Sequence, residues 1–263
     1  MNNRKSSYLY KSLKLLEKWL PGNTETFMQW YKEHPENTDL EEDTAGLTYC
    51  LFSFPVRNPD GKESNIPFPD AQILERIILL VYDHDQIIAD CSALHGSAQN
   101  VCDDPSVLHY LQSESDWMDL EQYVLSEMFF SDHAEISGET LLYSNAYVTT
   151  SYRRKGIFTR MLEMMREHTL RNTYGNTVLY TVLSLDPDVA CYGPDTPDHP
   201  YVYSMKQDEP KRLINAEIMK KLGYLPVRLE ENEPVENDDG TKLWFALRKE
   251  EDQIIDTNAS FKA

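Results

Sequence analysis

Hydrophobic and polar positions along the chain follow two periods, which together predict a structure of helices and strands. Apolar residues recur at helical spacing over four main segments, 8–20, 24–34, 157–170 and 211–222. Alternating or continuous runs rich in β-branched and aromatic residues predict strands over 47–56, 77–82, 87–94, 141–148, 178–185, 225–229 and 242–247.

The segments between these elements are predicted as turns and loops, with one insert. The acidic run 39–43 is typical of a solvated turn, and Asn-Pro-Asp-Gly at 58–61 is a strong turn signal. Residues 83–86 join the strands of a hairpin. Residues 95–137 form a polar insert with helical spacing, and 186–210 form a long loop rich in proline, aspartate and tyrosine.

Two helices show which of their faces should be buried. In the first, the apolar stripe consists of Leu9, Leu13, Leu16 and Leu20. In the last, the residues expected to face inward are Leu213, Ile214, Ile218 and Leu222. Gly223 follows directly, which indicates a helix end with a left-handed glycine cap.

Composition narrows the classes of function. The chain has 263 residues and a net charge of -19, which argues against nucleic acid as a partner because phosphate binding needs a cationic surface. The charge either attracts cationic molecules or only keeps the protein soluble. No apolar stretch approaches the roughly 20 residues needed to cross a membrane.

The cysteines and histidines predict a cytoplasmic location and no metal site. The four cysteines form no CxxC pair, so free thiols in a reducing cytoplasm are the simplest interpretation. The seven histidines are scattered, and no zinc or other metal site is expected.

The segment after strand 141–148 carries the clearest chemical signal. Arg153, Arg154, Lys155 and Gly156 stand directly before a predicted helix, and Arg160 follows one turn later. The unpaired N–H groups of a helix N-terminus bind anions, and glycine allows the backbone to approach a phosphate closely. The loop is cationic in an acidic chain, and no GxxxxGK[ST] or GxGxxG motif suggests another nucleotide-binding fold.

The stretch Val148-Thr-Thr-Ser-Tyr-Arg-Arg-Lys-Gly-Ile-Phe158 resembles the acyl-CoA loop of the GNAT superfamily of N-acetyltransferases, whose pattern is Arg/Gln-x-x-Gly-x-Gly/Ala. Arg153 and Gly156 match this pattern, whereas Phe158 replaces the usual small residue. Residues 215–224 are similar to the last helix of the family and its Gly-aromatic exit. The resemblance covers residues 141–248 well and 47–94 loosely.

The resemblance implies an α+β fold with a mixed, mostly antiparallel central sheet flanked by helices. Residues 1–263 would form a single domain with the acyl-CoA-binding core at 141–248. The N-terminal helices, 1–40, would be an extension, and 95–137 a helical insert. Neither segment is covered by the resemblance.

The resemblance also implies acetyl-CoA as co-substrate. The amides of Arg154 to Thr159 would hold its pyrophosphate, and main-chain groups of Ala146 and Val148 would pair with the pantetheine arm. The implied binding set is Ala146, Val148, Arg153, Arg154, Lys155, Gly156, Ile157, Phe158 and Thr159.

The sequence offers several candidates for the general acid and the general base of acetyl transfer. The usual family acid, a tyrosine on the last helix, corresponds here to Met219, so Tyr224, Tyr203 or Tyr192 would have to substitute, or no acid is needed. Candidates for the base are Glu139, Asp186, Asp188 and His199. Tyr192, His199 and Tyr203 would also form an amine-binding wall, although 186–210 equally fits a rigid surface loop.

The resulting hypothesis is an N-acetyltransferase that acetylates a primary amine of a cationic small molecule or peptide. The alternative is a non-catalytic acyl-CoA-binding sensor or interaction module, which the methionine at 219 leaves open. A homodimer is compatible with the sequence, which does not decide the oligomeric state.

Overall fold

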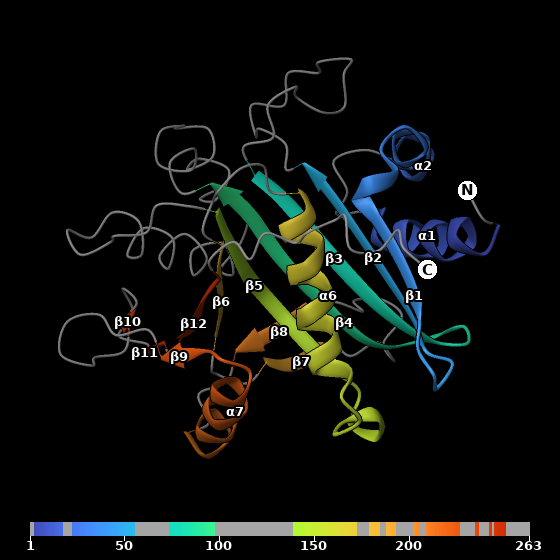
Figure 1. Ribbon diagram of the computed structural model, residues 1–263. Helices are drawn as coiled ribbons and strands as arrows, with labels where there is room; N and C mark the ends of the chain where they lie inside the picture. Colours follow the sequence, from blue (N-terminus) through green and yellow to red (C-terminus); the bar gives the residue numbers. More distant parts are fainter. Residues whose placement is uncertain are drawn as a thin grey trace, which may run out of the picture.

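An eight-stranded sheet in the order β1-β2-β3-β4-β5-β6-β12-β9 forms the centre of the computed structural model (Figure 1). The structure describes residues 3–17, 23–55, 74–97, 139–172, 179–184, 188–192, 202–205, 209–226, 235–236, 242–243 and 245–250.

Neighbouring strands of this sheet are antiparallel, with one exception. The strands are β1 Thr38–Glu42, β2 Thr48–Pro55, β3 Leu74–Asp83, β4 Gln86–Ser97, β5 Glu139–Val148, β6 Leu179–Ser184, β12 Phe245–Glu250 and β9 Leu225–Pro226. Only β5 and β6 pair in parallel. Two further ladders join β7 Asp188–Tyr192 to β8 Val202–Met205 and β10 Val235–Glu236 to β11 Lys242–Leu243.

Helices lie on both faces of the sheet, which confirms the expected fold class. The α-helices are α1 Asn3–Leu16, α2 Thr24–Glu33, α6 Ile157–Asn172 and α7 Glu209–Lys221. Asn23 caps α2 by accepting a hydrogen bond from the Thr26 amide at 2.9 Å. The order β5, loop, α6, β6, α7, β9 and β12 is the order that the resemblance implies.

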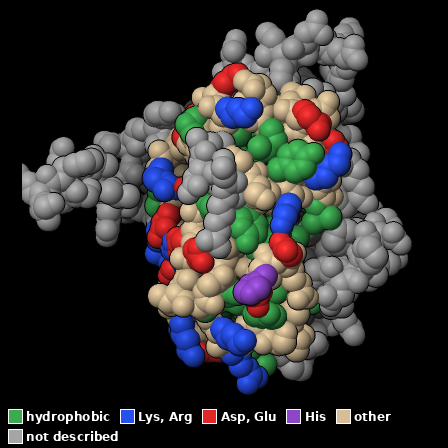
Figure 2. Space-filling view, turned by 90° about the vertical axis from the view of Figure 1, so that its right-hand side faces the viewer, with side chains coloured by type: hydrophobic (Ala, Val, Ile, Leu, Met, Phe, Trp, Pro, Cys, Tyr) green, Lys and Arg blue, Asp and Glu red, His purple; other side chains and the backbone are tan. Residues whose placement is uncertain are grey.

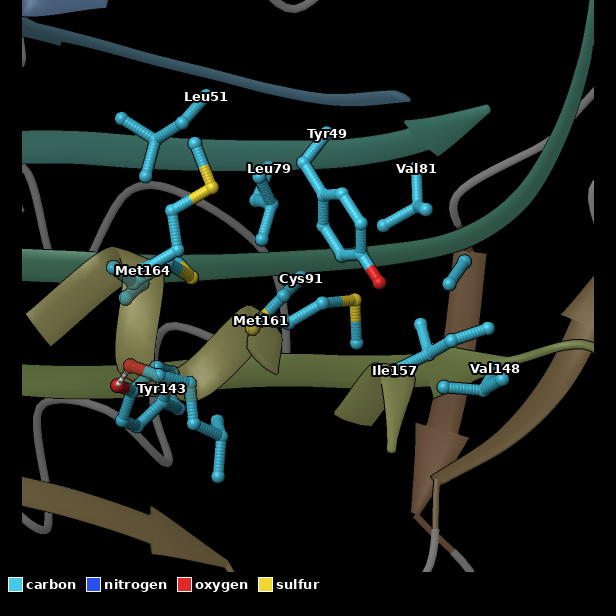
Figure 3. Packing of buried hydrophobic residues seen from close by; sticks show 14 of the residues in the cluster. Tyr49, Leu51, Leu79, Val81, Cys91, Tyr143, Val148, Ile157, Met161 and Met164 are labelled. Carbon is cyan, nitrogen blue, oxygen red and sulfur yellow. Dashed lines mark hydrogen bonds between the residues drawn. The ribbon is translucent and has the colours of Figure 1, made fainter. Parts of the chain in front are cut away.

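Two hydrophobic clusters, one on each face of the sheet, hold the helices against it. There are two because successive side chains of a strand point to opposite faces. On one face α1 and α2 pack against β2 and β3. Leu9, Leu13 and Leu16 of the predicted stripe are buried, and Leu20 lies outside the described residues. On the other face α6 packs across the strands, and Figure 3 shows Met161 and Met164 of α6 against side chains of the sheet.

The prediction of a solvated turn at 39–43 was wrong, because residues 38–42 form the edge strand β1. Asp39 contacts Arg171 and His168, and Glu41 contacts Arg160, all three on α6. The acids are therefore balanced by partners that are more than a hundred residues away in sequence.

The predicted inward face of the last helix was wrong for three of its four residues, whereas the fourth, Leu222, packs against the core cluster. Leu213 and Ile214 are 57% and 60% exposed, and Ile218 is 40% exposed. Met219 is instead buried, and Ala216 and Leu222 pack against the same cluster. Both stripes have helical spacing, so only packing decides between them.

Two predicted connections differ from the structure in part. The loop 186–210 contains the β7–β8 ladder within its described part. Residues 95–97 of the predicted insert belong to β4, and 98–138 lie outside the described residues.

A chain of polar side chains, in which Glu75 is buried and His95 and Glu139 are half-buried, crosses β3, β4 and β5. His95 Nδ1 lies 3.1 Å from Glu75 Oε2, and His95 Nε2 lies 3.1 Å from Glu139 Oε2. Burial disfavours the charged imidazole, but the contacts and charges of the two carboxylates raise the pKa of His95 to about 9. Burial also opposes ionisation of Glu75, and its hydrogen bond with His95 lowers its pKa despite this.

This arrangement predicts a loss of stability at alkaline pH. The pKa of His95 is raised above its unfolded value of 6.5, so its contribution is complete below pH 6.5 and is lost as the pH rises through about 9. The contribution is about 3 kcal/mol. Urea unfolding between pH 6 and 10 should therefore show a falling free energy for the wild type and a flatter profile for His95→Gln. Parallel profiles for the two proteins would contradict it.

Candidate functional site

The central feature of the site is the short pairing between β5 and β6. Their parallel register runs from Glu139↔Leu179 to Tyr143↔Leu183. β6 ends at Ser184, whereas β5 continues to Val148. Beyond Tyr143, therefore, β5 keeps β4 as its paired neighbour and has no register with β6 in the described residues.

A β-bulge lies at the same position. Ser92 pairs with Asn145 and Ala93 with Tyr143, so Ser144 is an extra residue on β5. A bulge bends its strand and increases the local twist, and such bulges occur next to active sites. The bulge therefore coincides with the point at which β5 and β6 part.

Main-chain groups on the last part of β5 alternate between its two edges. The Thr149 amide donates to the Ile88 carbonyl at 2.8 Å, toward β4. In an antiparallel ladder alternate residues face opposite edges, so Val148 and Ala146 direct their main-chain groups away from β4. The Val148 carbonyl accepts a hydrogen bond from Arg153 Nε at 2.8 Å on that side. The two residues assigned to the pantetheine arm thus face the edge that β6 leaves.

The loop after β5 forms an uncapped helix N-terminus. The first amide of α6 that bonds a helical carbonyl is that of Arg160, which donates to Gly156 at 3.0 Å. Ile157, Phe158 and Thr159 precede it, and their amides have no helical acceptor. Gly156, with a φ of 81°, has no side chain that could cap the helix, and the first turn holds no acid. This end of α6 is therefore suited to an anion.

The apolar residues of the loop point into the protein and leave the backbone accessible. Ile157 is 2% exposed, and Phe158 packs against the cluster beneath α6. The large side chain of Phe158, where the resembled pattern has a small residue, therefore serves packing. Thr159 is half-buried.

The positive charges of the loop are not equivalent. Arg160 hydrogen-bonds Glu41 and lies near Glu163 and Glu167, and the hydrogen bond with Glu41 raises its pKa. The expectation that Arg160 adds charge for a ligand was wrong, since its charge is neutralised. Arg154 and Lys155 are exposed and form no ion pair with a described residue.

A pair of buried tyrosines lies where β5 and β6 part. The Tyr143 hydroxyl donates to the Leu162 carbonyl at 3.0 Å and is hydrogen-bonded to Tyr224. Burial raises the pKa of Tyr143 well above 10, and the charge and hydrogen bond of Tyr224 add to this. Sequence reasoning selected Tyr224 and missed Tyr143, whose only signal was a hydroxyl within an apolar strand.

Met219, at the position where the resemblance implies a tyrosine acid, is a core residue. It is 2% exposed, and the Tyr224 amide donates to its carbonyl at 2.9 Å. Its side chain belongs to the same cluster as Tyr143 and Tyr224. This position thus supports the tyrosine pair by packing.

The remaining candidates are only partly placed. Glu139 starts β5, about 13 Å before Tyr143 along the strand, and its carboxylate contacts His95. Tyr192 and Tyr203 lie on β7 and β8, and β7 lies close to β5. Asp186 and His199 lie outside the described residues.

Comparisons with known proteins give similarities at the level of structure. No protein-family model and no curated protein matches the sequence. An agmatine N-acetyltransferase mutant is similar with a TM-score of 0.40 and 9% identity over 66% of this chain and 74% of its own. A Drosophila melanogaster polyamine N-acetyltransferase has a TM-score of 0.39 and 11% identity over 65% and 73%.

A third similar structure is Arabidopsis thaliana NAA60 in complex with acetyl-CoA, with a TM-score of 0.35 and 12% identity over 77% of this chain and 98% of its own. At these levels of similarity, the reaction has to be argued from the residues of this chain. Among its described helices, none is long and apolar enough to cross a membrane.

The unequal charges predict unequal effects on anion binding. Arg154→Met should weaken binding of inorganic pyrophosphate several-fold, because an exposed cation near a helix N-terminus is lost. Arg160→Met should change the affinity by less than about twofold, because Glu41 already neutralises Arg160. Calorimetric titration at low salt measures both variants, and an equal loss in the two would contradict this division.

Proposed function

We propose that this chain is an acetyl-CoA-dependent N-acetyltransferase that acts on a primary amine. The observation that carries the proposal is the continuity of three features. The bulge of β5, its edge away from β4 and the uncapped N-terminus of α6 follow one another along the chain. They offer polar main-chain groups next to an anion site.

Their spacing suits an extended thioester with a pyrophosphate at one end. From Val148 back to Ser144, β5 covers about 13 Å. Pyrophosphate bound at the amides after Arg153 would let the pantetheine arm run along Val148 and Ala146. The thioester would then lie near the bulge and the Tyr143–Tyr224 pair.

At this position the chemistry is an acyl transfer. The neutral amine attacks the thioester carbon, the carbon–sulfur bond breaks, and the sulfur leaves as a thiolate. The nitrogen, positively charged after the attack, gives up one proton to form the amide, and the thiolate takes up one proton to form the free thiol. An alkylammonium with a pKa of about 10.4 must first lose a proton to a base. Main-chain N–H groups of β5 would stabilise the carbonyl oxygen as it becomes negative.

Tyr224 is the proposed donor to the leaving sulfur. It is buried beside Tyr143, whose raised pKa keeps the Tyr143 phenol protonated at neutral pH. When the Tyr143 hydroxyl turns its proton from the Leu162 carbonyl to Tyr224, the Tyr224 proton is available to donate a hydrogen bond to the thiolate. With a pKa of about 8.5, the thiol is already a fair leaving group. The contribution of Tyr224 is then moderate.

Glu139 and Asp186 remain the proposed bases. Glu139 is one strand segment away from Tyr143, so a proton would reach it through intervening water. Its carboxylate is 21% exposed and faces His95, which holds it in position. Asp186 lies two residues after the end of β6 in sequence.

A cationic amine is the proposed acceptor. The net charge of -19 attracts cations, and the β7–β8 ladder beside β5 carries Asp188, Tyr192 and Tyr203. Together with His199 these residues would form the acceptor wall. The buried free thiols Cys50 and Cys91 fit a reducing compartment, so the proposal includes a cytoplasmic location.

The second candidate is a non-catalytic acyl-CoA sensor, which the buried Met219 at the acid position favours. Calorimetry with acetyl-CoA tests the binding that both candidates share. Release of free thiol across a panel of amines then separates the enzyme from the sensor. Release with neutral or acidic amines but with no cationic amine would contradict the proposed acceptor.

Gly156 offers a matched test of the anion site. Gly156 and Gly46 have the same φ of 81° and space for a Cβ atom, so alanine at either position costs about 1–2 kcal/mol of stability. Gly156→Ala should also weaken acetyl-CoA binding at least tenfold, because the loop amides move, whereas Gly46→Ala should leave it unchanged. Equal affinities of the two variants in calorimetry would contradict the assigned site.

Tyr224→Phe tests the proposed donor. We expect kcat to fall roughly 10- to 100-fold with little change in the KM for acetyl-CoA, because the hydroxyl acts on the leaving sulfur. Tyr49→Phe is the control, since Tyr49 is buried in the same cluster and its hydroxyl contacts Asp43 at 3.4 Å. If both variants lose kcat equally, the effect of Tyr224 is structural.

A further inference from the structure

Lys155 is held in place by a support that the proposed reaction leaves unexplained. Its ammonium lies 4.7 Å from the centroid of the Tyr152 ring. The Tyr152 hydroxyl donates to Asp83 Oδ2 at 2.6 Å, on the turn between β3 and β4. Lys155 is therefore stacked on a ring that is itself anchored to another part of the sheet.

The turn between β3 and β4, which anchors Tyr152, is itself held by contacts with α1. His84 Nδ1 lies 3.1 Å from Asp83 Oδ1, so Asp83 has a second contact. From α1, the Tyr8 hydroxyl donates to the His84 carbonyl at 3.2 Å, and Lys11 Nζ lies 2.5 Å from Asp85. The N-terminal helix thus stabilises the turn that positions Tyr152.

Stacking reduces the cost of binding with this lysine. An exposed lysine loses side-chain entropy when a ligand immobilises it. A cation over an aromatic ring is already restricted, and the hydrogen bond to Asp83 prevents the ring from moving. The same hydrogen bond raises the pKa of Tyr152, so its phenol stays neutral.

Lys155 also lies to one side of the pyrophosphate position. The amides at the start of α6 face along the helix axis, whereas the Lys155 side chain folds back over Tyr152, toward the β3–β4 turn. Figure 2 shows basic side chains gathered at the lower end of this face, the end at which the β5–α6 loop lies in Figure 1. Because Arg160 is neutralised by Glu41, the cations left for a ligand among the described residues of the loop are Arg153, Arg154 and Lys155. Arg153 is turned toward β5, where its Nε donates to the Val148 carbonyl, so Lys155 is the one that lies over Tyr152.

Coenzyme A carries a third phosphate, on the 3′ position of its ribose, which the loop amides do not account for. We infer that Lys155, held in place by Tyr152 and Asp83, forms a preorganised binding site for this 3′-phosphate. The site makes the chain select acyl groups carried on coenzyme A over those carried on dephospho-coenzyme A. This inference rests on the proposed function, because it assigns one phosphate of the same ligand.

Calorimetric titration of the full chain with coenzyme A and with dephospho-coenzyme A tests it. The wild type should bind coenzyme A about tenfold more tightly, as expected for one charge-assisted contact. Lys155→Met should bring this ratio close to one by weakening only coenzyme A. Tyr152→Phe keeps the ring and loses the anchor to Asp83, so its ratio should lie between the two.

Lys220→Met is the control, because Lys220 is an exposed lysine in the last turn of α7. It should keep the wild-type ratio. Thermal unfolding of each variant checks that the chain remains folded.

Equal affinity of the wild type for the two ligands would overturn the inference and leave the proposed function intact. An equal loss for both ligands in Lys155→Met would assign Lys155 to the pyrophosphate and overturn it as well. A wild-type ratio in Tyr152→Phe would overturn the role of the anchor. If neither ligand binds the wild type, the proposed function itself fails.

Discussion

The parallel pairing of β5 with β6 is the constraint on which the site depends. Parallel neighbours cannot be joined by a tight turn and need a crossover, which here is α6. The crossover places the N-terminus of α6 directly after β5. Because the pairing ends at Tyr143, the rest of β5 has one edge directed away from β4, next to that helix end. An anion site and a polar strand edge are therefore adjacent for topological reasons.

Charged contacts position α6 over the sheet. Arg160 reaches Glu41 near the start of the helix, and Arg171 and His168 reach Asp39 near its end. Such pairs add little to stability when exposed, but their geometry allows few alternative positions of the helix. They also neutralise Arg160, so the charge offered to a ligand comes from a smaller part of the loop than its composition indicates.

Most of the fold was predictable because its signals are local. The spacing of apolar residues in α6, the hairpin of β3 and β4, and the glycine at 223 each depend on neighbouring residues in sequence. The same holds for Gly156, whose positive φ and place before a helix follow from the residues around it. Where the signal was ambiguous the prediction failed, as in α7, whose two apolar stripes fit a helix equally well.

The anion loop of the candidate site was predictable from the sequence, whereas the Tyr143–Tyr224 pair was not. The anion loop is contiguous in sequence, so its residue types and order were sufficient. The Tyr143–Tyr224 pair joins β5 to the end of α7, and the Asp83–Tyr152 contact joins the β3–β4 turn to the loop. These contacts connect residues far apart in the chain, and no local pattern marks them.

The sequence by itself thus determined most of the elements of the central sheet and its helices, their order and the loop that leads into α6. The reason is that backbone propensity, glycine and side-chain periodicity act over a few residues. Only the tertiary structure decided that β1 is a strand, that Arg160 is neutralised and that Tyr143 lies where β5 and β6 part. The physical reason is that burial and charge pairing depend on which side chains meet across the sheet. That meeting is a property of the folded chain as a whole.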